Sequence, residues 1–272
     1  MEYKQKPYKN IRLKNPFLTI AGLALAVFLL GIGIAALCGA RDTNLTLPDG
    51  EQIRFTGLFD IHGNPISGTV YYSNGLSAEI DVDAGRVTYS DGTVFYGTLD
   101  ADYRRSGKGS ITWKNGDSYE GDFLADRLSG RGVYRFKSGD VYEGDFVDGK
   151  KHGEGKYTSF DGGYYEGGFE NDLRHGKGKL VTSDGAVYEG EFESGVKSGN
   201  GKCTYPNGDV YEGGFKGDLR HGEGKYIWSN GETYTGEFAN GNMNGFGVYT
   251  WPEGRASYTG YFKDGVIVVV DD

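Results

Sequence analysis

The sequence has few of the residues that cross-link or interrupt a small fold, with two cysteines and six prolines among 272 residues. Cys38 and Cys203 are too few for a disulfide framework or a four-ligand zinc site. Low proline and an aromatic content of 14% argue against a disordered chain. Aliphatic residues are scarce outside one N-terminal stretch, which argues against a compact two-layer α/β enzyme.

Glycine is the residue in excess. The chain has 48 glycines, well over twice the average share of about 7%. They do not follow the Gly-x-y period of collagen. We therefore expect glycine to occupy set positions of a regular structure.

The one long uncharged stretch lies near the N-terminus, over residues 16–40. At about 1.5 Å per residue, a helix of this length spans a hydrocarbon layer of about 30 Å. Residues 1–15 contain five basic residues and one acidic residue. This bias predicts a basic cytoplasmic tail, a single transmembrane helix over 16–40, and an extracytoplasmic location for the remainder, at a cell surface or in a lumen.

Two alternatives for this stretch are disfavoured. A cleaved signal peptide usually has an apolar core of about 7–15 residues, and this stretch is longer. A lipoprotein signal at Cys38 would need a small residue where Leu37 stands.

The remainder, residues 41–272, is acidic. It keeps 24 basic and 37 acidic residues, for a net charge of −13. We see no segregation of the basic residues, so the charge predicts that this part does not bind nucleic acid.

A 23-residue period dominates the chain. Its signature is Tyr-x-Gly-x-Phe, followed by Gly-x-Gly and, seven residues later, a turn glycine. Six copies of the signature begin at Tyr119, Tyr142, Tyr165, Tyr188, Tyr211 and Tyr234.

The period divides the chain. Residues 41–54 are expected to form a linker and an N-terminal cap, 55–118 degenerate repeats, and 119–257 the regular repeats. Residues 258–272 are expected to hold a partial repeat and a last strand. Atypical end repeats are usual in stacked arrays because they cap the stack.

These signatures resemble the MORN repeat family. The resemblance implies an all-β fold, an elongated single-layer antiparallel sheet of successive β-hairpins. It also implies a use as a scaffold, a dimerisation element or a membrane-proximal binding surface. Enzymes that share the resemblance carry a separate catalytic domain, for which no segment of this sequence remains. We therefore expect no enzymatic activity, no catalytic residues and no cofactor.

Each repeat is expected to be one hairpin, because triplets such as Phe160-Asp161-Gly162 are strong turn signals. Side chains alternate along a strand, so the tyrosine, glycine and phenylalanine of each signature share one face. These aromatic residues are expected mainly to hold the sheet together, and they are also the candidate binding groove: Tyr119, Phe123, Tyr142, Phe146, Tyr165, Phe169, Tyr188, Phe192, Tyr211, Phe215, Tyr234 and Phe238.

The other face is predicted to carry paired charges. Glu166 and its repeat equivalents form a column, and Lys156 and its equivalents should lie beside them. His152, His175 and His221 share one repeat position, which the sequence places in a loop before Gly-x-Gly. Strand spacing of about 4.8 Å keeps neighbouring copies about 9.6 Å apart, too far to share a metal ion. No metal site is expected.

The function predicted from these features is a membrane-anchored structural or adaptor scaffold that binds other proteins or self-associates. Two alternatives are binding of polysaccharide or cell-wall glycan and binding of phospholipid, the latter disfavoured by the net charge. The β-branched run 266–270 is expected to be a free edge strand and a site of homo-oligomerisation.

Overall fold

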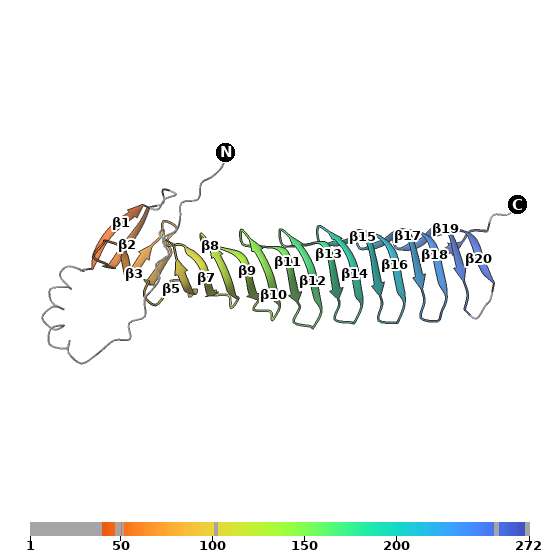
Figure 1. The fold of residues 1–272 in the computed structure, drawn as a ribbon, viewed down its shortest axis with the longest axis horizontal. Coiled ribbons are helices and arrows are strands. Elements are labelled where there is room, and N and C mark those ends of the chain that lie inside the picture. The colour runs from red at the N-terminus through yellow and green to blue at the C-terminus, as the bar shows by residue number, and fades with distance from the viewer. Residues whose placement is uncertain (1–39, 47–49, 51, 101–102, 253–255, 270–272) are drawn as a thin grey trace.

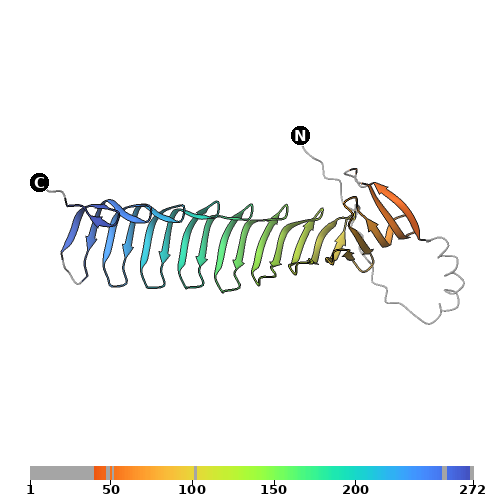
Figure 2. The same ribbon diagram turned by 180° about the vertical axis from the view of Figure 1, so that it is seen from behind.

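A computed structural model describes residues 40–46, 50, 52–100, 103–252 and 256–269. These residues form one elongated antiparallel sheet whose strands succeed one another along its length (Figures 1 and 2). The strands are β1 (Arg41–Thr46), β2 (Gln52–Phe59), β3 (Pro65–Tyr71), β4 (Ser77–Asp81), β5 (Arg86–Tyr89), β6 (Val94–Leu99), β7 (Arg105–Thr112), β8 (Ser118–Leu124), β9 (Arg127–Arg135), β10 (Val141–Val147), β11 (Lys150–Thr158), β12 (Tyr164–Glu170), β13 (Leu173–Val181), β14 (Val187–Glu193), β15 (Val196–Thr204), β16 (Val210–Lys216), β17 (Leu219–Ile227), β18 (Thr233–Ala239), β19 (Asn242–Thr250), β20 (Ser257–Lys263) and β21 (Val266–Ile267).

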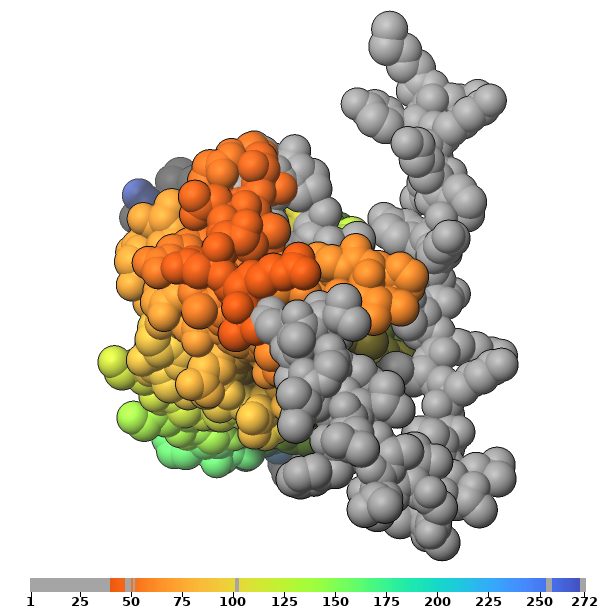
Figure 3. All heavy atoms as spheres, turned by 90° about the vertical axis from the view of Figure 1, so that its left-hand side faces the viewer, coloured from red at the N-terminus to blue at the C-terminus, as the bar shows by residue number. Residues whose placement is uncertain are grey.

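Each strand pairs with the strands before and after it in the chain, as the sequence predicts for successive hairpins. Within the described residues all strands belong to this one sheet. Figure 3 views it from its N-terminal end, with the first strands in front in orange. Strand β1 lies within the predicted linker and cap, and it covers the edge of β2.

Two kinds of turn connect the strands. At one end, the Ser159 N–H donates to the Gly163 carbonyl at 2.8 Å, and the intervening Gly162 has φ +91°. This is the predicted three-residue turn. At the other end, Asn171 and Asp172 have φ +49° and +73°, which makes a two-residue turn with the twist that hairpins favour.

The core is one row of interlocked rings. The Tyr142 ring meets Phe146 of its own strand at 5.1 Å and Phe169 of the next repeat at 5.0 Å, both nearly perpendicular. The same contacts recur along the sheet. Each aromatic ring removes about 150–250 Å² from water, so this row supplies the burial that a second layer would otherwise give.

Glycine pairs give the rings their space. Gly190 lies opposite Gly201, and a Cβ added to Gly201 would lie 2.5 Å from the Tyr188 hydroxyl. The Tyr188 hydroxyl in turn donates to the Glu191 carbonyl at 3.0 Å. Each core tyrosine ring therefore lies over bare backbone, and its hydroxyl donates to a carbonyl there.

The predicted position of the histidines is wrong. His152 lies in β11, His175 in β13 and His221 in β17. The strands extend through this position because the pairing shifts by a β-bulge, for example between Gly144 and Asp145. No group of His, Cys, Asp or Glu side chains in the described residues could hold a metal ion.

The strand predicted over 266–270 is also longer than the strand observed. β21 covers Val266–Ile267, whereas Val268 and Val269 lie outside any strand and residue 270 is not described. The Val268 N–H donates to the Tyr261 carbonyl at 2.9 Å, and the Tyr258 hydroxyl reaches the Val268 carbonyl at 3.3 Å. Val268 thus stays beside Tyr261 of β20, one residue beyond the end of β21.

The predicted transmembrane helix lies, except for residue 40, outside the described residues and stays a prediction. Among the residues described here, no helix has the length and apolar character needed to cross a membrane.

Candidate functional site

The rings proposed from the sequence as a binding groove form the core row. They come from β8, β10, β12, β14, β16 and β18, and none is more than 6% exposed: Tyr119, Phe123, Tyr142, Phe146, Tyr165, Phe169, Tyr188, Phe192, Tyr211, Phe215, Tyr234 and Phe238. This burial explains how the sheet is held together. A partner on this face would first meet a different set of rings.

That set, which we call the aromatic strip, comprises partly buried rings on the same face: Trp113, Tyr134, Phe136, Tyr157, Tyr205, Tyr226, Trp228, Tyr249 and Trp251. Tyr134 lies directly opposite Tyr119 and Tyr142 in the register, which fixes the face. Each repeat has two positions on the strip, one near the end of a strand and one at the start of the following turn, and rings occupy most of them.

Within the strip the rings touch in two continuous runs. In the first, Trp113 stacks on Tyr134 at 5.3 Å, and Phe136 continues the contact to Tyr157 at 5.9 Å. The second runs from Tyr205 through Tyr226, Trp228 and Tyr249 to Trp251, with centroids 4.6–6.0 Å apart. The face of Tyr157 and its equivalents follows from strand alternation, because they lie opposite core tyrosines, whereas the turn members lie outside the strands. Their 23-residue spacing is the signal that could have found them.

Acidic side chains tie the strip tyrosines to the preceding repeat. Asp140 accepts hydrogen bonds from the Tyr157 hydroxyl and the Phe160 N–H, each at 2.9 Å. We call each such acid–tyrosine pair a staple: Asp117–Tyr134, Asp140–Tyr157, Asp209–Tyr226 and Glu232–Tyr249.

The staples shift the pKa values of both partners. The Phe160 N–H and then the Tyr157 hydroxyl lower the pKa of Asp140, because both stabilise the carboxylate. Burial, followed by the hydrogen bond to Asp140, raises the pKa of Tyr157 to about 12. Both groups therefore keep the protonation state that the staple needs over the neutral pH range.

The same face carries a row of cations, one per repeat: Lys151, Arg174, Lys197 and Arg220. Lys151 and Arg220 lie over the strip rings Tyr157 and Tyr226, whereas Arg174 and Lys197 lie over rings of the core row. The Arg220 guanidinium lies 4.8 Å from the Tyr226 ring centre and donates to the Gly241 carbonyl. Such positions over a ring face are favourable cation–π geometry. The face thus offers aromatic area edged by positive charge.

Comparison with known sequences fits the geometry. The MORN repeat profile matches seven consecutive segments, which together span more than half of the chain: residues 102–118, 119–141, 142–164, 165–187, 188–210, 211–233 and 234–254. The chain belongs to the MORN repeat family. From the second segment on, each MORN repeat begins at a tyrosine of the core row.

Solved structures to which the chain shows similarity include the TCP10 domain of Danio rerio CPAP, in complex with a peptide of STIL. It is 15% identical, with a TM-score of 0.37, and the match covers 82% of this chain and 100% of that one. The TCP domain of Drosophila melanogaster SAS-4, in complex with a proline-rich motif of Ana2, is 13% identical with a TM-score of 0.26, covering 91% and 99%. No curated protein matches this sequence.

The opposite face of the MORN repeats carries the predicted charge pairs. Lys179 Nζ lies 2.7 Å from Glu189, and Lys156 Nζ lies 3.7 Å from Glu166. All four side chains are largely exposed, so each pair contributes little to stability. This face is a solvated charged surface, in contrast to the aromatic strip.

Proposed function

We propose that this MORN repeat protein is a scaffold that binds other proteins through the aromatic strip. The observation that carries the proposal is the strip itself, two runs of partly buried rings on one face, with Lys151 and Arg220 over two of its tyrosines. Large aromatic side chains and arginine dominate the energetic centres of protein interfaces. Trp228 and Tyr249, 5.3 Å apart, are an example of such a pair on this face.

We further propose that the scaffold is anchored in a membrane by residues 16–40, with the repeats on the extracytoplasmic side. The basic tail before this stretch supports that orientation. The family, a repeat used as a scaffold, supports a role in binding rather than in catalysis.

Glycan binding is a second candidate, favoured by one observation. The tyrosine hydroxyls of the strip lie beside carboxylates, as Tyr226 does beside Asp209 at 2.6 Å. Rings flanked by acids suit stacking on a sugar and hydrogen bonding to its hydroxyls.

A photo-reactive amino acid placed in the full chain tests the proposal. Positions 228 and 227 are adjacent in sequence, but Trp228 belongs to the strip whereas Ile227 lies on the charged face. We expect protein cross-links in cells from position 228 and few from position 227. Equal cross-linking from both positions would contradict the proposal, and glycan captured at position 228 in place of protein would favour the second candidate.

A further inference from the structure

The aromatic strip is interrupted between Tyr157 and Tyr205. The period places four more strip positions there, and the chain fills them with Ser159, Leu180, Thr182 and Cys203. We call this interval the gap. In neighbouring repeats the matching positions hold rings, such as Phe136 and Tyr226.

The staples are missing at the gap as well. The positions that hold Asp117, Asp140, Asp209 and Glu232 elsewhere hold Gly163 and Ala186 here. Two successive repeats have therefore lost both the strand tyrosine and the carboxylate that would bind it. Because the acid and the tyrosine are absent together, the gap leaves neither partner of a staple unpaired.

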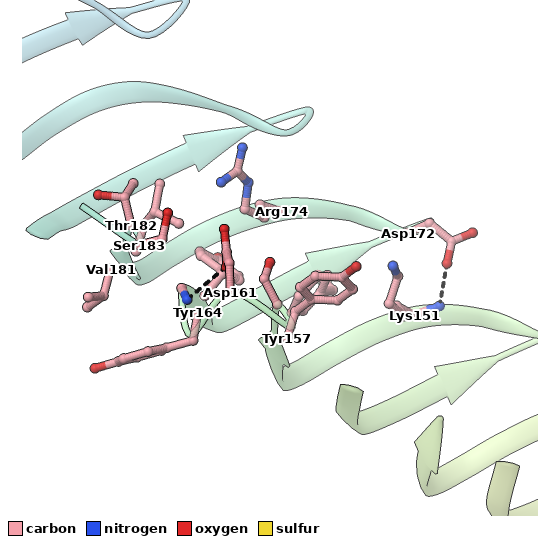
Figure 4. Close-up of a pocket in the computed structure, with 14 residues that line it drawn as sticks. Lys151, Tyr157, Asp161, Tyr164, Asp172, Arg174, Val181, Thr182 and Ser183 are labelled. Atoms are coloured by element: carbon pink, nitrogen blue, oxygen red, sulfur yellow. Dashed lines mark hydrogen bonds between the residues drawn. The ribbon is translucent and has the colours of Figure 1, made fainter. Parts of the chain in front are cut away.

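The lost rings leave a cavity of about 400 Å³. Tyr157 and Leu180 line its sides, core rings Tyr165 and Phe169 lie beneath, and Ser159 contributes a small side chain. Figure 4 shows this lining, which comes from β11, β12, β13 and the turns between them. The volume is within the range of about 300–1,000 Å³ that ligand sites occupy.

A cation at the cavity faces rings rather than an acid. Lys151 Nζ lies 5.1 Å from the centre of the Tyr157 ring and 5.7–6.0 Å from those of Phe136, Tyr142 and Phe169. No carboxylate pairs with this ammonium group among the described residues. Burial lowers the pKa of Lys151, and the nearby charge of Asp172 opposes that shift.

The acids at the cavity are already engaged. Asp172 accepts the Lys151 backbone N–H at 2.9 Å, and Asp161 accepts the Gly163 N–H at 3.1 Å. Arg174 also lines the cavity and lies 5.8 Å from the Tyr165 ring. An aromatic ring entering the gap would meet Lys151 and Arg174 much as Tyr226 meets Arg220.

We infer that the gap is a docking site for an aromatic side chain, presented by a partner protein in a segment that carries acidic rather than basic neighbours. The partner's ring would complete the strip, and its carboxylates would face Lys151 and Arg174. This inference rests on the proposed function, since it names the chemistry of the partner that the strip binds.

A short probe peptide tests the site on the full chain in detergent. The probe is acetyl-Asp-(4-fluoro-Phe)-Asp-amide, and binding is followed by broadening of its ¹⁹F resonance. We expect the probe to bind, and its affinity to fall at least tenfold when both of its aspartates are replaced by lysine. In competition, unlabelled acetyl-Asp-Phe-Asp-amide should displace the probe, and acetyl-Asp-Ala-Asp-amide should be at least tenfold weaker as a competitor. A probe that does not bind, or that binds equally well with lysines, would overturn the inference.

Two variants locate the binding. Ser159→Phe with Thr182→Tyr supplies rings of the kind that neighbouring repeats hold and should abolish probe binding. Lys151→Met keeps an unbranched side chain and removes the cation, and we expect a loss of about fivefold. Lys156→Met, on the charged face, is the matched control and should bind as the parent does. Unchanged binding in the Lys151 variant would place the probe elsewhere. Cross-linking at position 228 decides the proposed function separately.

Discussion

The Tyr226 hydroxyl donates a hydrogen bond of 2.6 Å to the Asp209 carboxylate, across the boundary between two MORN repeats. Asp209 also accepts the Ser229 N–H at 2.8 Å. One carboxylate thus holds a strip ring and the turn that follows it. The staples give the sheet side-chain connections between repeats in addition to the backbone ladder.

This pair should be energetically coupled. Tyr226→Phe and Asp209→Asn each remove a partner, and the double variant should lose less stability than the sum of the single variants. A hydrogen bond to a charged group contributes about 1.5–3 kcal/mol, which sets the upper range of the coupling. Denaturant unfolding of the full chain and the three variants measures it. Strictly additive losses would show that the two side chains are not energetically coupled, which would contradict this prediction.

Glycines beneath the rings should tolerate no side chain. Gly201→Ala would place a Cβ 2.5 Å from the Tyr188 ring, so we expect a loss of about 1–3 kcal/mol from overpacking. Asn200→Ala changes the adjacent, exposed residue on the other face and is the control. Both variants can be compared in one unfolding series, and equal losses would contradict the face assignment.

Acid should weaken the stapled repeats. Hydrogen bonds hold the pKa of Asp140 below its unfolded value of about 3.9. Its stabilising effect is therefore complete above that value and is lost as the pH falls through the folded pKa. Melting temperatures recorded from pH 6 to pH 2 should drop less steeply for Asp140→Asn than for the parent. Parallel curves would count against this role.

Much of the fold could be predicted from the sequence because the period repeats one local rule. Tyr165, Gly167 and Phe169 alternate on one strand, and the Phe160-Asp161-Gly162 turn fixes which residues of β11 oppose them. The predicted Glu–Lys pairing follows from the same parity and is confirmed at Lys179–Glu189.

What could not be predicted depends on departures from that rule. The β-bulge that carries His175 into β13 has no signal in the alternation of polar and apolar residues. The distinction between core row and strip depends on which ring is more deeply buried. Tyr165 is buried and Tyr157 only partly buried, although both are tyrosines on the same face. The gap emerges only when Ser159 is compared with the ring-bearing turns and with the cavity beside it.

The proposed orientation in the membrane is open to a direct test. Lys114→Cys places a thiol on an exposed turn, in a background with Cys38→Ser. We expect a membrane-impermeant maleimide to label this thiol in intact cells, because the basic tail keeps the N-terminus inside. Labelling seen only after lysis would reverse the orientation.

The central claim is that the aromatic strip is an interaction surface, and hydroxyl-radical footprinting tests it most directly. The full-length protein is labelled in intact cells and again after purification, and oxidation is compared residue by residue. We predict that Trp228 and Tyr249 are protected in cells relative to the purified protein, whereas Ile227 and Val248 on the charged face, 37% and 36% exposed, react equally in both. Equal oxidation of the strip rings in the two samples, or protection confined to the charged face, would contradict the account.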